Sequence, residues 1–198
     1  MADKRSVAVL LFPGVELLDF AGPFEVFSAA RTSAESRERL LHVFTVAESD
    51  EPIHCNNPVA VLPDYVLEEC PAADLLVVPG GMGTRTAVDR PNLIEWIRDR
   101  AKVAEVTTSV CTGSFLLAKA GLLDGRSATT HWASIARMRT DFPNVTVQES
   151  VRWVDAWPVV SSAGVSAGID MALYVLSQLY GDAVASATAR GIEYDHWQ

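Results

Sequence analysis

The chain has 198 residues, and its 16 lysines and arginines against 25 aspartates and glutamates give a formal net charge of −9. Phosphate backbones are held by clustered cations, and because the sequence contains no such cluster, we expect no nucleic-acid partner. With 49% hydrophobic and 21% charged residues, the composition is that of a globular protein, which we expect to fold as one domain over residues 1–198.

Membrane insertion is not expected either. The longest stretch without a charged residue, 156–169, contains Pro158 and two glycines, whereas a helix that spans a bilayer needs about 20 apolar residues. The apolar run 6–12 is too short for a signal peptide and has no small-residue cleavage site after it. We therefore expect a cytoplasmic protein with reduced thiols. Its three cysteines have no metal-ligand spacing and are Cys55, Cys70 and Cys111.

Short runs rich in valine and leucine alternate with segments of helical periodicity along the first part of the chain. The runs predicted to be strands are 7–12, 40–47, 74–78 and 103–110. The segments predicted to be helices are 22–31, 91–102, 113–120 and 132–140. Continuous rather than alternating hydrophobicity is typical of strands buried on both faces of a parallel sheet. The order predicts a doubly wound α/β sandwich.

Two further regions have weaker or later signals. Residues 53–65, with prolines and two adjacent asparagines, favour short extended pieces that form an edge hairpin. Toward the C-terminus the pattern predicts three short strands, 145–148, 151–155 and 159–162, with a turn over 155–158. It then predicts a long helix over 164–180 and a final helix over 182–190.

Cys111 lies where the strand 103–110 passes into the helix 113–120, and so few residues join them that the turn must be sharp. In an open α/β sheet this is the carboxyl edge of a strand, where ligands bind, next to a helix N-terminus that favours an anion. We therefore expect the Cys111 thiol to ionise more readily than its usual pKa of about 8.5 allows and to act as a nucleophile. The alternative is a small buried hydrophobic residue, the role expected of Cys55 and Cys70.

Four motifs in a fixed order carry a resemblance to a known family. They are LDFAGP at 18–23, VPGG at 78–81, VCTGS at 110–114 and ATTHW at 128–132. From residue 7 to residue 194 the chain resembles the ThiJ/PfpI superfamily, and its isocyanide hydratase branch most of all. The resemblance implies a flavodoxin-like sandwich, a homodimer, a small-molecule substrate, no metal, no cofactor, and a cysteine with an acidic partner.

The resemblance implies that Asp19 is this partner. Its apolar neighbours favour a neutral carboxyl, so Asp19 and Cys111 would share a proton, with thiolate and protonated Asp19 as the working state. The alternative is that Asp19 is the N-cap of the next helix, because Pro23 suits a helix start. The family positions also imply backbone amides of Gly81 and Thr112 as donors to a developing negative charge.

The substrate pocket implied by the resemblance includes Gly80, Met82, Gly164 and Val165. In protease-like branches a histidine follows the cysteine, but here that residue is Thr112, which disfavours a Cys-His-acid triad and peptidase activity. The hydroxyl of Thr112 remains available to the thiol or the substrate. We interpret His131 as a helix-start or supporting residue, and Trp132 as a packing residue.

The resulting hypothesis is hydration of an isocyanide to an N-substituted formamide. Cys111 would attack to form a thioimidate, and Asp19 would act as acid and then as base, with no cofactor or metal. One alternative is a non-enzymatic sensor of small molecules or oxidants, because an exposed, acidic thiol also oxidises readily. Another is hydration of 2-oxoaldehydes of the glyoxalase type, which usually has a glutamate at the position of Asp19.

Overall fold

The computed structural model describes residues 4–33, 36 and 38–195. Its centre is a seven-stranded sheet with the order β10-β11-β7-β6-β1-β2-β5. In that order the strands are β10 (Trp153–Ala156), β11 (Val159–Ser162), β7 (Val106–Val110), β6 (Leu75–Val78), β1 (Arg5–Leu10), β2 (Leu41–Ala47) and β5 (Tyr65–Val66). Neighbouring strands are parallel except β10 and β11, which pair antiparallel.

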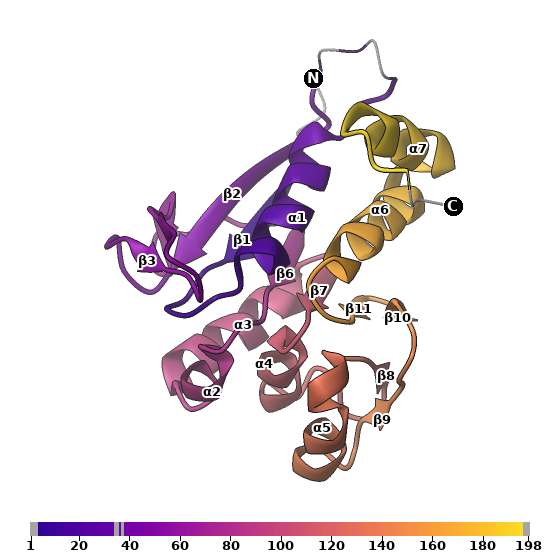
Figure 1. Cartoon of the computed structure of the whole chain (residues 1–198). Coiled ribbons are helices and arrows are strands. Elements are labelled where there is room, and N and C mark those ends of the chain that lie inside the picture. Colours follow the sequence, from indigo (N-terminus) through magenta and orange to yellow (C-terminus); the bar gives the residue numbers. More distant parts are fainter. Residues whose placement is uncertain (1–3, 34–35, 37, 196–198) are drawn as a thin grey trace.

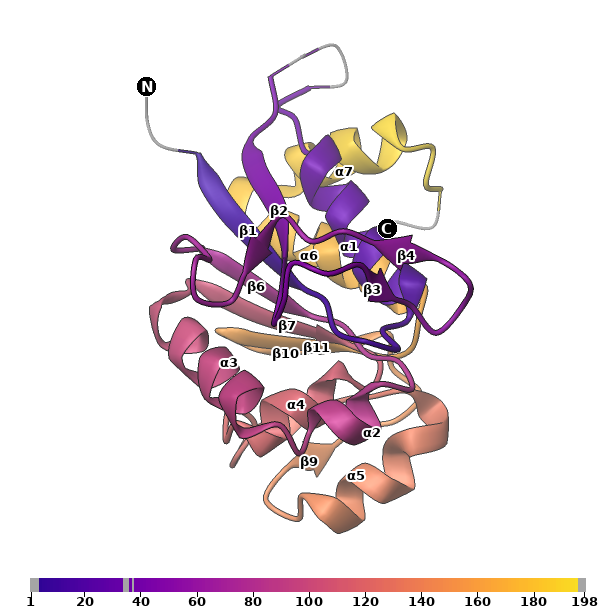
Figure 2. The ribbon, with the colours of Figure 1, turned by 90° about the vertical axis from the view of Figure 1, so that its left-hand side faces the viewer.

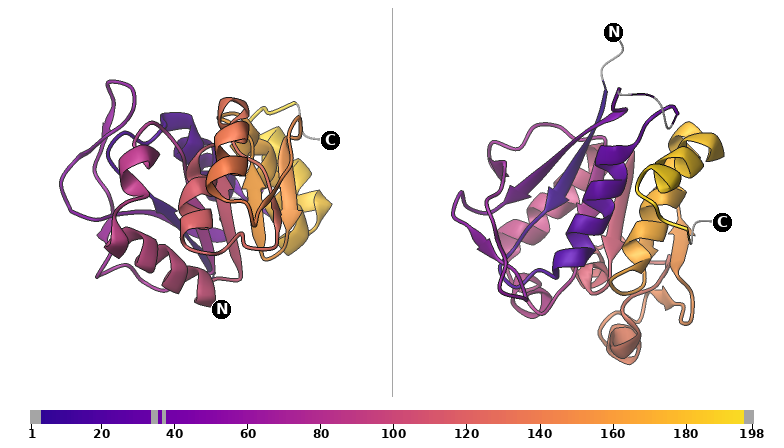
Figure 3. Two further views of the ribbon diagram at one scale, coloured as in Figure 1. Left: turned by 90° about the horizontal axis from the view of Figure 1, so that it is seen from below. Right: turned by 45° about the horizontal axis from the view of Figure 1, so that its top comes forward.

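Helices cover both faces of this sheet (Figures 1 and 2). One face carries α1 (Leu17–Ala29), α6 (Ala167–Tyr180) and α7 (Asp182–Gly191). The other carries α2 (Thr84–Ala87), α3 (Pro91–Val103) and α4 (Gly113–Lys119), with a 3-10 turn η1 (Trp132–Ser134) and α5 (Ile135–Asp141) beyond them. Figure 3 shows α1 and α6 side by side on their face. The fold is the predicted α/β sandwich, mostly parallel and flavodoxin-like.

The central strands are buried on both faces, which explains their continuous hydrophobicity. Every residue of β6 and β7 is buried, and so is β1 from Val7 onward. Parallel strands cannot be joined by tight hairpins, so β1 passes to β2 through α1 and β6 passes to β7 through α2 and α3. The carboxyl ends of β1, β6, β7 and β11 therefore meet at one edge, and the segments that follow them lie together there.

Helix α1 begins earlier than the sequence predicted, at Leu17 rather than at residue 22. The prediction used Pro23 as a start signal, but Pro23 lies inside the helix, where it removes one backbone hydrogen bond. Glu16, not Asp19, is the N-cap residue. The alternative role of Asp19 as a helix cap is therefore wrong, and its side chain is available for another task.

Other boundaries differ for local reasons. Strand β7 begins at Val106, because Val103 ends α3 and is 69% exposed. Helix α6 begins at Ala167, so that the predicted helical residues Gly164 and Val165 form the turn after β11. The short helix α2 was not predicted.

The region 53–65 forms a hairpin, but not at the sheet edge. Its strands β3 (Ile53–His54) and β4 (Ala60–Val61) pair with each other in a separate antiparallel sheet, and the edge strand of the main sheet is β5. The predicted strand at 145–148 is β9 (Thr146–Val147), which pairs with the unpredicted β8 (Ser127–Ala128) outside the main sheet. Two-residue strands leave too short a pattern to assign from sequence.

Candidate active site

The backbone of Cys111 is held in a left-handed conformation, with φ at 57°. Its N–H is shared between the carbonyls of Ser162 and Ala163, each at 3.2 Å. Its carbonyl accepts hydrogen bonds from the hydroxyls of Ser114 at 3.1 Å and Thr130 at 2.9 Å. A non-glycine residue in this conformation costs roughly 1–3 kcal/mol, and these contacts stabilise it. The predicted sharp turn at Cys111 is therefore present, and it projects the side chain out of the strand direction.

Asp19, in the first turn of α1, lies against the sharp turn at Cys111, which we call the cysteine elbow. None of the surface of Asp19 is exposed. Its Oδ2 accepts the Gly80 N–H at 3.0 Å. The carboxyl also interacts with the Cys111 thiol and with the Val165 N–H, both of which lower its pKa. Its Oδ1 makes no hydrogen bond of standard geometry with any described residue. Asp19 and Cys111 are therefore in contact, and within the described ranges no cationic side chain forms an ion pair with the Asp19 carboxylate.

Burial raises the pKa of both acids in this pair. It raises the pKa of Asp19 to about 7, against the lowering effect of the Gly80 and Cys111 hydrogen bonds. Burial and the Asp19 charge raise the pKa of the Cys111 thiol to about 12, against the lowering effect of Thr112. The expectation of an acidic thiol is therefore wrong. Cys111 is only 6% exposed, lies beside a carboxylate, and precedes a helix of 7 residues, so desolvation outweighs the helix dipole.

The pair titrates as a unit with two macroscopic steps. Between the two steps it holds one proton, which the carboxyl and the sulfur share across their hydrogen bond. Thiolate with protonated Asp19 stays a prediction, and it differs from thiol with ionised Asp19 only in the position of that one proton.

Thr112 fixes the loop after β6. Its Oγ1 accepts the Gly81 N–H at 3.0 Å and the Thr84 hydroxyl at 3.1 Å, and it lies 3.2 Å from the Gly81 carbonyl. The Gly81 N–H, implied by the resemblance as a donor to a developing negative charge, is therefore engaged with Thr112 Oγ1. The Thr112 N–H and hydroxyl both lower the pKa of the Cys111 thiol, so Thr112 does face the sulfur as expected.

The backbone at Gly80 and at Val165 permits the close approach of the segments that surround Asp19. A Cβ on Gly80 would lie 2.5 Å from the Thr112 nitrogen and 2.8 Å from Asp19 Oδ2, so only glycine fits between them. Val165 has φ at 53°, a rare value for a β-branched residue, and this conformation turns its N–H toward the Asp19 carboxyl. Strain at the ends of β7 and β11 thus assembles the surroundings of Asp19.

Cys111 opens into a cavity of about 280 Å³ at the carboxyl edge of the sheet. The lining residues are Glu16, Asn56, Gly81, Met82, Arg85, Cys111, Thr112, His131, Ala133, Ser134 and Val165. Of the predicted pocket residues, Met82 and Val165 line it, whereas Gly80 and Gly164 are not among its lining residues. Cys111 lines the cavity, and Asp19, which is fully buried, does not.

Several lining residues were not predicted from the sequence. Glu16 follows β1, and its Oε2 accepts a hydrogen bond of 3.2 Å from the Asn56 side chain, which belongs to the hairpin region. Arg85 comes from α2. The only signal for Glu16 was its place three residues before Asp19, and nothing in the sequence links Asn56 or Arg85 to the elbow.

The ATTHW motif contributes His131 to the cavity lining, next to Ala133 and Ser134 of η1. His131 is the N-cap of η1, where its Nδ1 accepts the Ala133 N–H at 3.3 Å, in agreement with the helix-start interpretation. Its ring also explains Gly164, because a Cβ there would lie 2.3 Å from His131 Cδ2. Trp132 is 80% exposed, so its interpretation as a packing residue is wrong.

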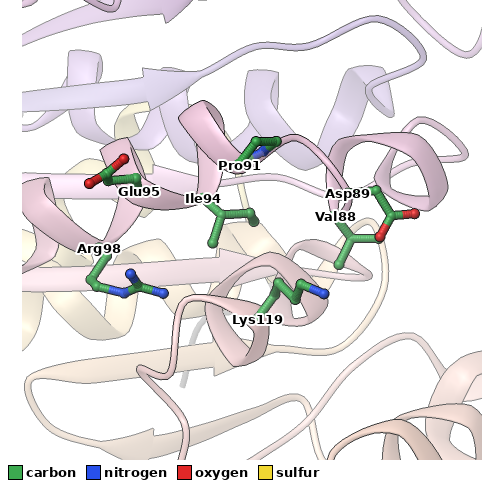
Figure 4. Close-up of a pocket in the computed structure, with 7 residues that line it drawn as sticks. All are labelled: Val88, Asp89, Pro91, Ile94, Glu95, Arg98 and Lys119. Atoms are coloured by element: carbon green, nitrogen blue, oxygen red, sulfur yellow. The ribbon is translucent and has the colours of Figure 1, made fainter.

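A larger hollow, of about 540 Å³, lies between α3 and α4 (Figure 4). Ile94 and Val88 form its apolar part, and Arg98 and Lys119 lie at its margin. It contains no cysteine and shares no residue with the Cys111 cavity. Cys55 and Cys70 are buried and free, as expected of packing residues, and burial raises the pKa of each.

Within the described ranges, no group of three or more histidine, cysteine, aspartate or glutamate side chains is arranged to hold a metal ion. In the same part of the chain, no helix is both long and apolar enough to cross a membrane. The site thus consists of a thiol, a carboxyl and backbone amides.

A doubly wound sheet with a strained cysteine elbow and a buried acid beside the sulfur defines a class of α/β proteins. The DJ-1/PfpI family profile matches residues 5–178, and the chain belongs to the DJ-1/PfpI family. It is 33% identical over 188 residues to the isonitrile hydratase of Pseudomonas putida, an alignment that covers 95% of this chain and 78% of that protein.

The other relatives are matched over different shares of their own length. The chain is 32% identical to the transcriptional regulator CdhR of Pseudomonas aeruginosa over 89% of its own length, and spans 51% of that regulator. Among solved structures, a ThiJ/PfpI family protein from Pseudomonas syringae matches with a TM-score of 0.86 and 30% identity, covering 98% of this chain and 76% of that one. DJ-1beta of Drosophila melanogaster matches in fold, with a TM-score of 0.83 and 23% identity, covering 98% of this chain and 100% of that one.

Proposed function

We propose that the protein is an isocyanide hydratase, which adds water to an isocyanide to give an N-substituted formamide. The observation that carries the proposal is the cavity-facing Cys111 thiol in contact with the fully buried Asp19 carboxyl. The likeness to the isonitrile hydratase of Pseudomonas putida supports the same reaction class. A terminal isocyanide carbon is small and accepts both a nucleophile and a proton, so one thiol and one carboxyl suffice for the chemistry.

In the first step Cys111 sulfur attacks the terminal carbon, and a C–S bond forms. The thiol proton passes to the Asp19 carboxylate as sulfur becomes nucleophilic, and Asp19 then delivers it to the same carbon. The product is a thioimidate, R–N=CH–S–Cys111, and Asp19 is ionised again. A carboxyl with a pKa near 7 can both accept and donate a proton near neutral pH, which suits this relay.

In the second step water adds to the thioimidate carbon. Asp19 takes one proton from the water as the C–O bond forms and passes it to the imine nitrogen. The C–S bond then breaks as the carbonyl of the formamide forms, and the hydroxyl proton passes by way of Asp19 to sulfur. The Thr112 N–H, which faces the sulfur, stabilises the negative charge that develops there as the thiolate leaves.

The proposal is tested by measuring formamide release from an aliphatic isocyanide. We expect Cys111→Ala to abolish turnover and Asp19→Asn to reduce it by about 100-fold or more, because proton relay is lost. Cys70→Ala is the matched control, since Cys70 lies outside the cavity. Mass spectrometry is expected to find the adduct on the Cys111 peptide. Undiminished turnover in either active-site variant would remove that residue from the mechanism.

We further propose a homodimer in the cytoplasm, as the resemblance implies. The hairpin β3–β4 packs against the start of α1, through the Asn56 N–H to the Val15 carbonyl at 2.8 Å. Leu62, which follows β4, is 67% exposed, and Leu18, in the first turn of α1, is 38% exposed, so both are available for an apolar contact between subunits. Light scattering of wild type and a Leu62→Glu variant tests this, with a shift toward the monomer expected in the variant.

The competing function is a non-enzymatic sensor, and the likeness to the transcriptional regulator CdhR supports it as the alternative. The raised pKa of the Cys111 thiol argues against easy oxidation, because thiolates rather than thiols react with peroxide. Titration with peroxide near neutral pH separates the two functions. Slow oxidation together with isocyanide turnover supports the hydratase, whereas rapid oxidation without turnover supports the sensor.

A further inference from the structure

The lining of the Cys111 cavity carries two charged side chains of opposite sign, Glu16 and Arg85, besides the buried Asp19 behind the sulfur. Catalysis as derived above uses neither. Besides these two and Cys111, the ionisable side chain in the lining is His131, whose Nδ1 already accepts the Ala133 N–H. The charges of Glu16 and Arg85 are therefore available to select what enters the cavity.

Arg85 has no carboxylate partner within the described part of the chain. Its Nη1 lies 2.6 Å from the sulfur of Met82, and a thioether is a weak acceptor. By contrast, Arg5, Arg90 and Arg152 each form an ion pair with a carboxylate. The guanidinium of Arg85 thus lines a cavity with most of its donor capacity unused by the protein.

Glu16 is placed differently. Its backbone N–H donates to the Gly80 carbonyl at 2.9 Å, and its carboxylate is held by the Asn56 side chain at 3.2 Å. The first contact places the backbone of Glu16, and the second holds its carboxylate at the cavity. An anion in the cavity is repelled from the Glu16 wall and attracted to Arg85, where a planar guanidinium can bind a carboxylate through two hydrogen bonds.

We propose that Arg85 binds a carboxylate of the substrate, which makes short isocyano carboxylates the preferred substrate class. This proposal rests on the proposed hydratase function for the reacting group, but the anion preference of the cavity is independent of it. The volume of about 280 Å³ matches a compact molecule with the reacting carbon at Cys111 and the carboxylate at Arg85.

The anion preference is measured without any isocyanide, by alkylation of Cys111 with iodoacetate and iodoacetamide. The two reagents have nearly the same shape and differ in charge, and in both the sulfur–carbon bond forms as iodide leaves. The rate on the Cys111 peptide is followed by mass spectrometry at one fixed pH. Because both reagents meet the same thiolate fraction, their rate ratio does not depend on the pKa of Cys111.

We expect Arg85→Gln to lower the iodoacetate-to-iodoacetamide ratio about fivefold, the factor for one solvent-screened charge pair near 4 Å. Glu16→Gln is expected to raise the same ratio, because it removes a repulsive charge. Lys102→Gln, which removes a cation from the far end of α3, is the matched control and is expected to stay within twofold of wild type. A fall of less than threefold in Arg85→Gln would overturn the proposal.

The second arm compares turnover of isocyanoacetate with that of its methyl ester. We expect wild type to prefer the acid in kcat/KM and Arg85→Gln to lose that preference through KM. An equal loss for acid and ester would count against carboxylate binding. If wild type hydrates neither compound, the hydratase function fails, while the alkylation ratio still decides whether Arg85 selects anions.

Discussion

Two aspartates are buried in different surroundings, Asp19 on α1 and Asp170 on α6. Asp170 is 6% exposed, and its Oδ2 is bound by Arg152 through Nε at 2.6 Å and also through Nη2. Its Oδ1 accepts the Tyr194 hydroxyl at 2.7 Å. Asp19 is fully buried and has only one amide of standard hydrogen-bond geometry and a thiol beside it.

Both aspartates are buried, and they differ in whether a cation balances the negative charge of the carboxylate. A buried carboxylate with a cation and a phenol stays in place as a structural anchor, here between β10, α6 and the segment after α7. A buried carboxyl without a cation has a pKa near neutral, so it exchanges a proton at little cost. The comparison therefore distinguishes an acid held in an ion pair from an acid free to exchange its proton, and four measurements test this distinction.

The largest expected effect is on the pH dependence of stability. The fold favours protonated Asp19, so its contribution is complete below the ordinary pKa of 3.8 and is lost as the pH rises through about 7. The shift corresponds to roughly 4 kcal/mol. Urea unfolding at pH 4 and pH 8 is expected to show the wild type losing about that much relative to Asp19→Asn. Parallel pH profiles of the two proteins would contradict the assignment.

The second effect tests the anchor. Arg152→Met leaves Asp170 buried without its cation, and the free energy of unfolding is expected to fall by roughly 2–3 kcal/mol. This is below the value for fully buried pairs, because the Arg152 side chain is 49% exposed. The double variant Arg152→Met/Asp170→Asn is expected to recover part of the loss. A single-variant loss below about 1 kcal/mol would make the ion pair dispensable.

The third effect concerns catalysis. The active form of the Asp19–Cys111 pair holds one proton, so kcat/KM for the isocyanide is expected to fall about tenfold per pH unit below a pKa near 7. It stays level above pH 7, because the thiol loses its proton only near pH 12. Rates measured from pH 5 to pH 9 check this. A profile that rises again between pH 8 and pH 9 would indicate that free thiolate is the reacting species.

The smallest effect is at Tyr194. Tyr194→Phe removes the hydroxyl that donates to Asp170 Oδ1, and we expect about 1 kcal/mol lower stability with unchanged isocyanide turnover. Thermal unfolding and the formamide assay check the two halves. Reduced turnover without reduced stability would mean that the anchor also acts on the site, through the turn at Val165.

The sequence was sufficient to predict the layers of the fold and the sharp turn at Cys111. The strands β6 and β11 and the elbow at Cys111 were predictable because strong local patterns, apolar runs and a strand–cysteine–glycine junction, coincide with tertiary burial. The raised pKa of Cys111 was not predictable from the sequence, because the thiol is desolvated by neighbours that lie far away in the sequence. A dipole argument from one helix end could not include this desolvation.

The cavity lining was the least predictable part. Asn56 and Arg85 come from a hairpin and a four-residue helix whose placement depends on tertiary contacts, such as the Gly14 N–H donating to the His54 carbonyl at 2.8 Å. Short elements have no periodicity to detect. The start of α1 was missed for another reason, because Pro23 lies inside the helix where a local rule places it at the beginning.

The Thr130 hydroxyl, bound to the Cys111 carbonyl, has a consequence for the range of molecules that can react. It ties the segment that supplies His131 to the cavity lining to the residue that carries the sulfur, so these two parts of the site keep their spacing. Met82, which also lines the cavity, is 55% exposed. Under the proposed function, substitutions at Met82 are therefore expected to change the accepted substrate size most.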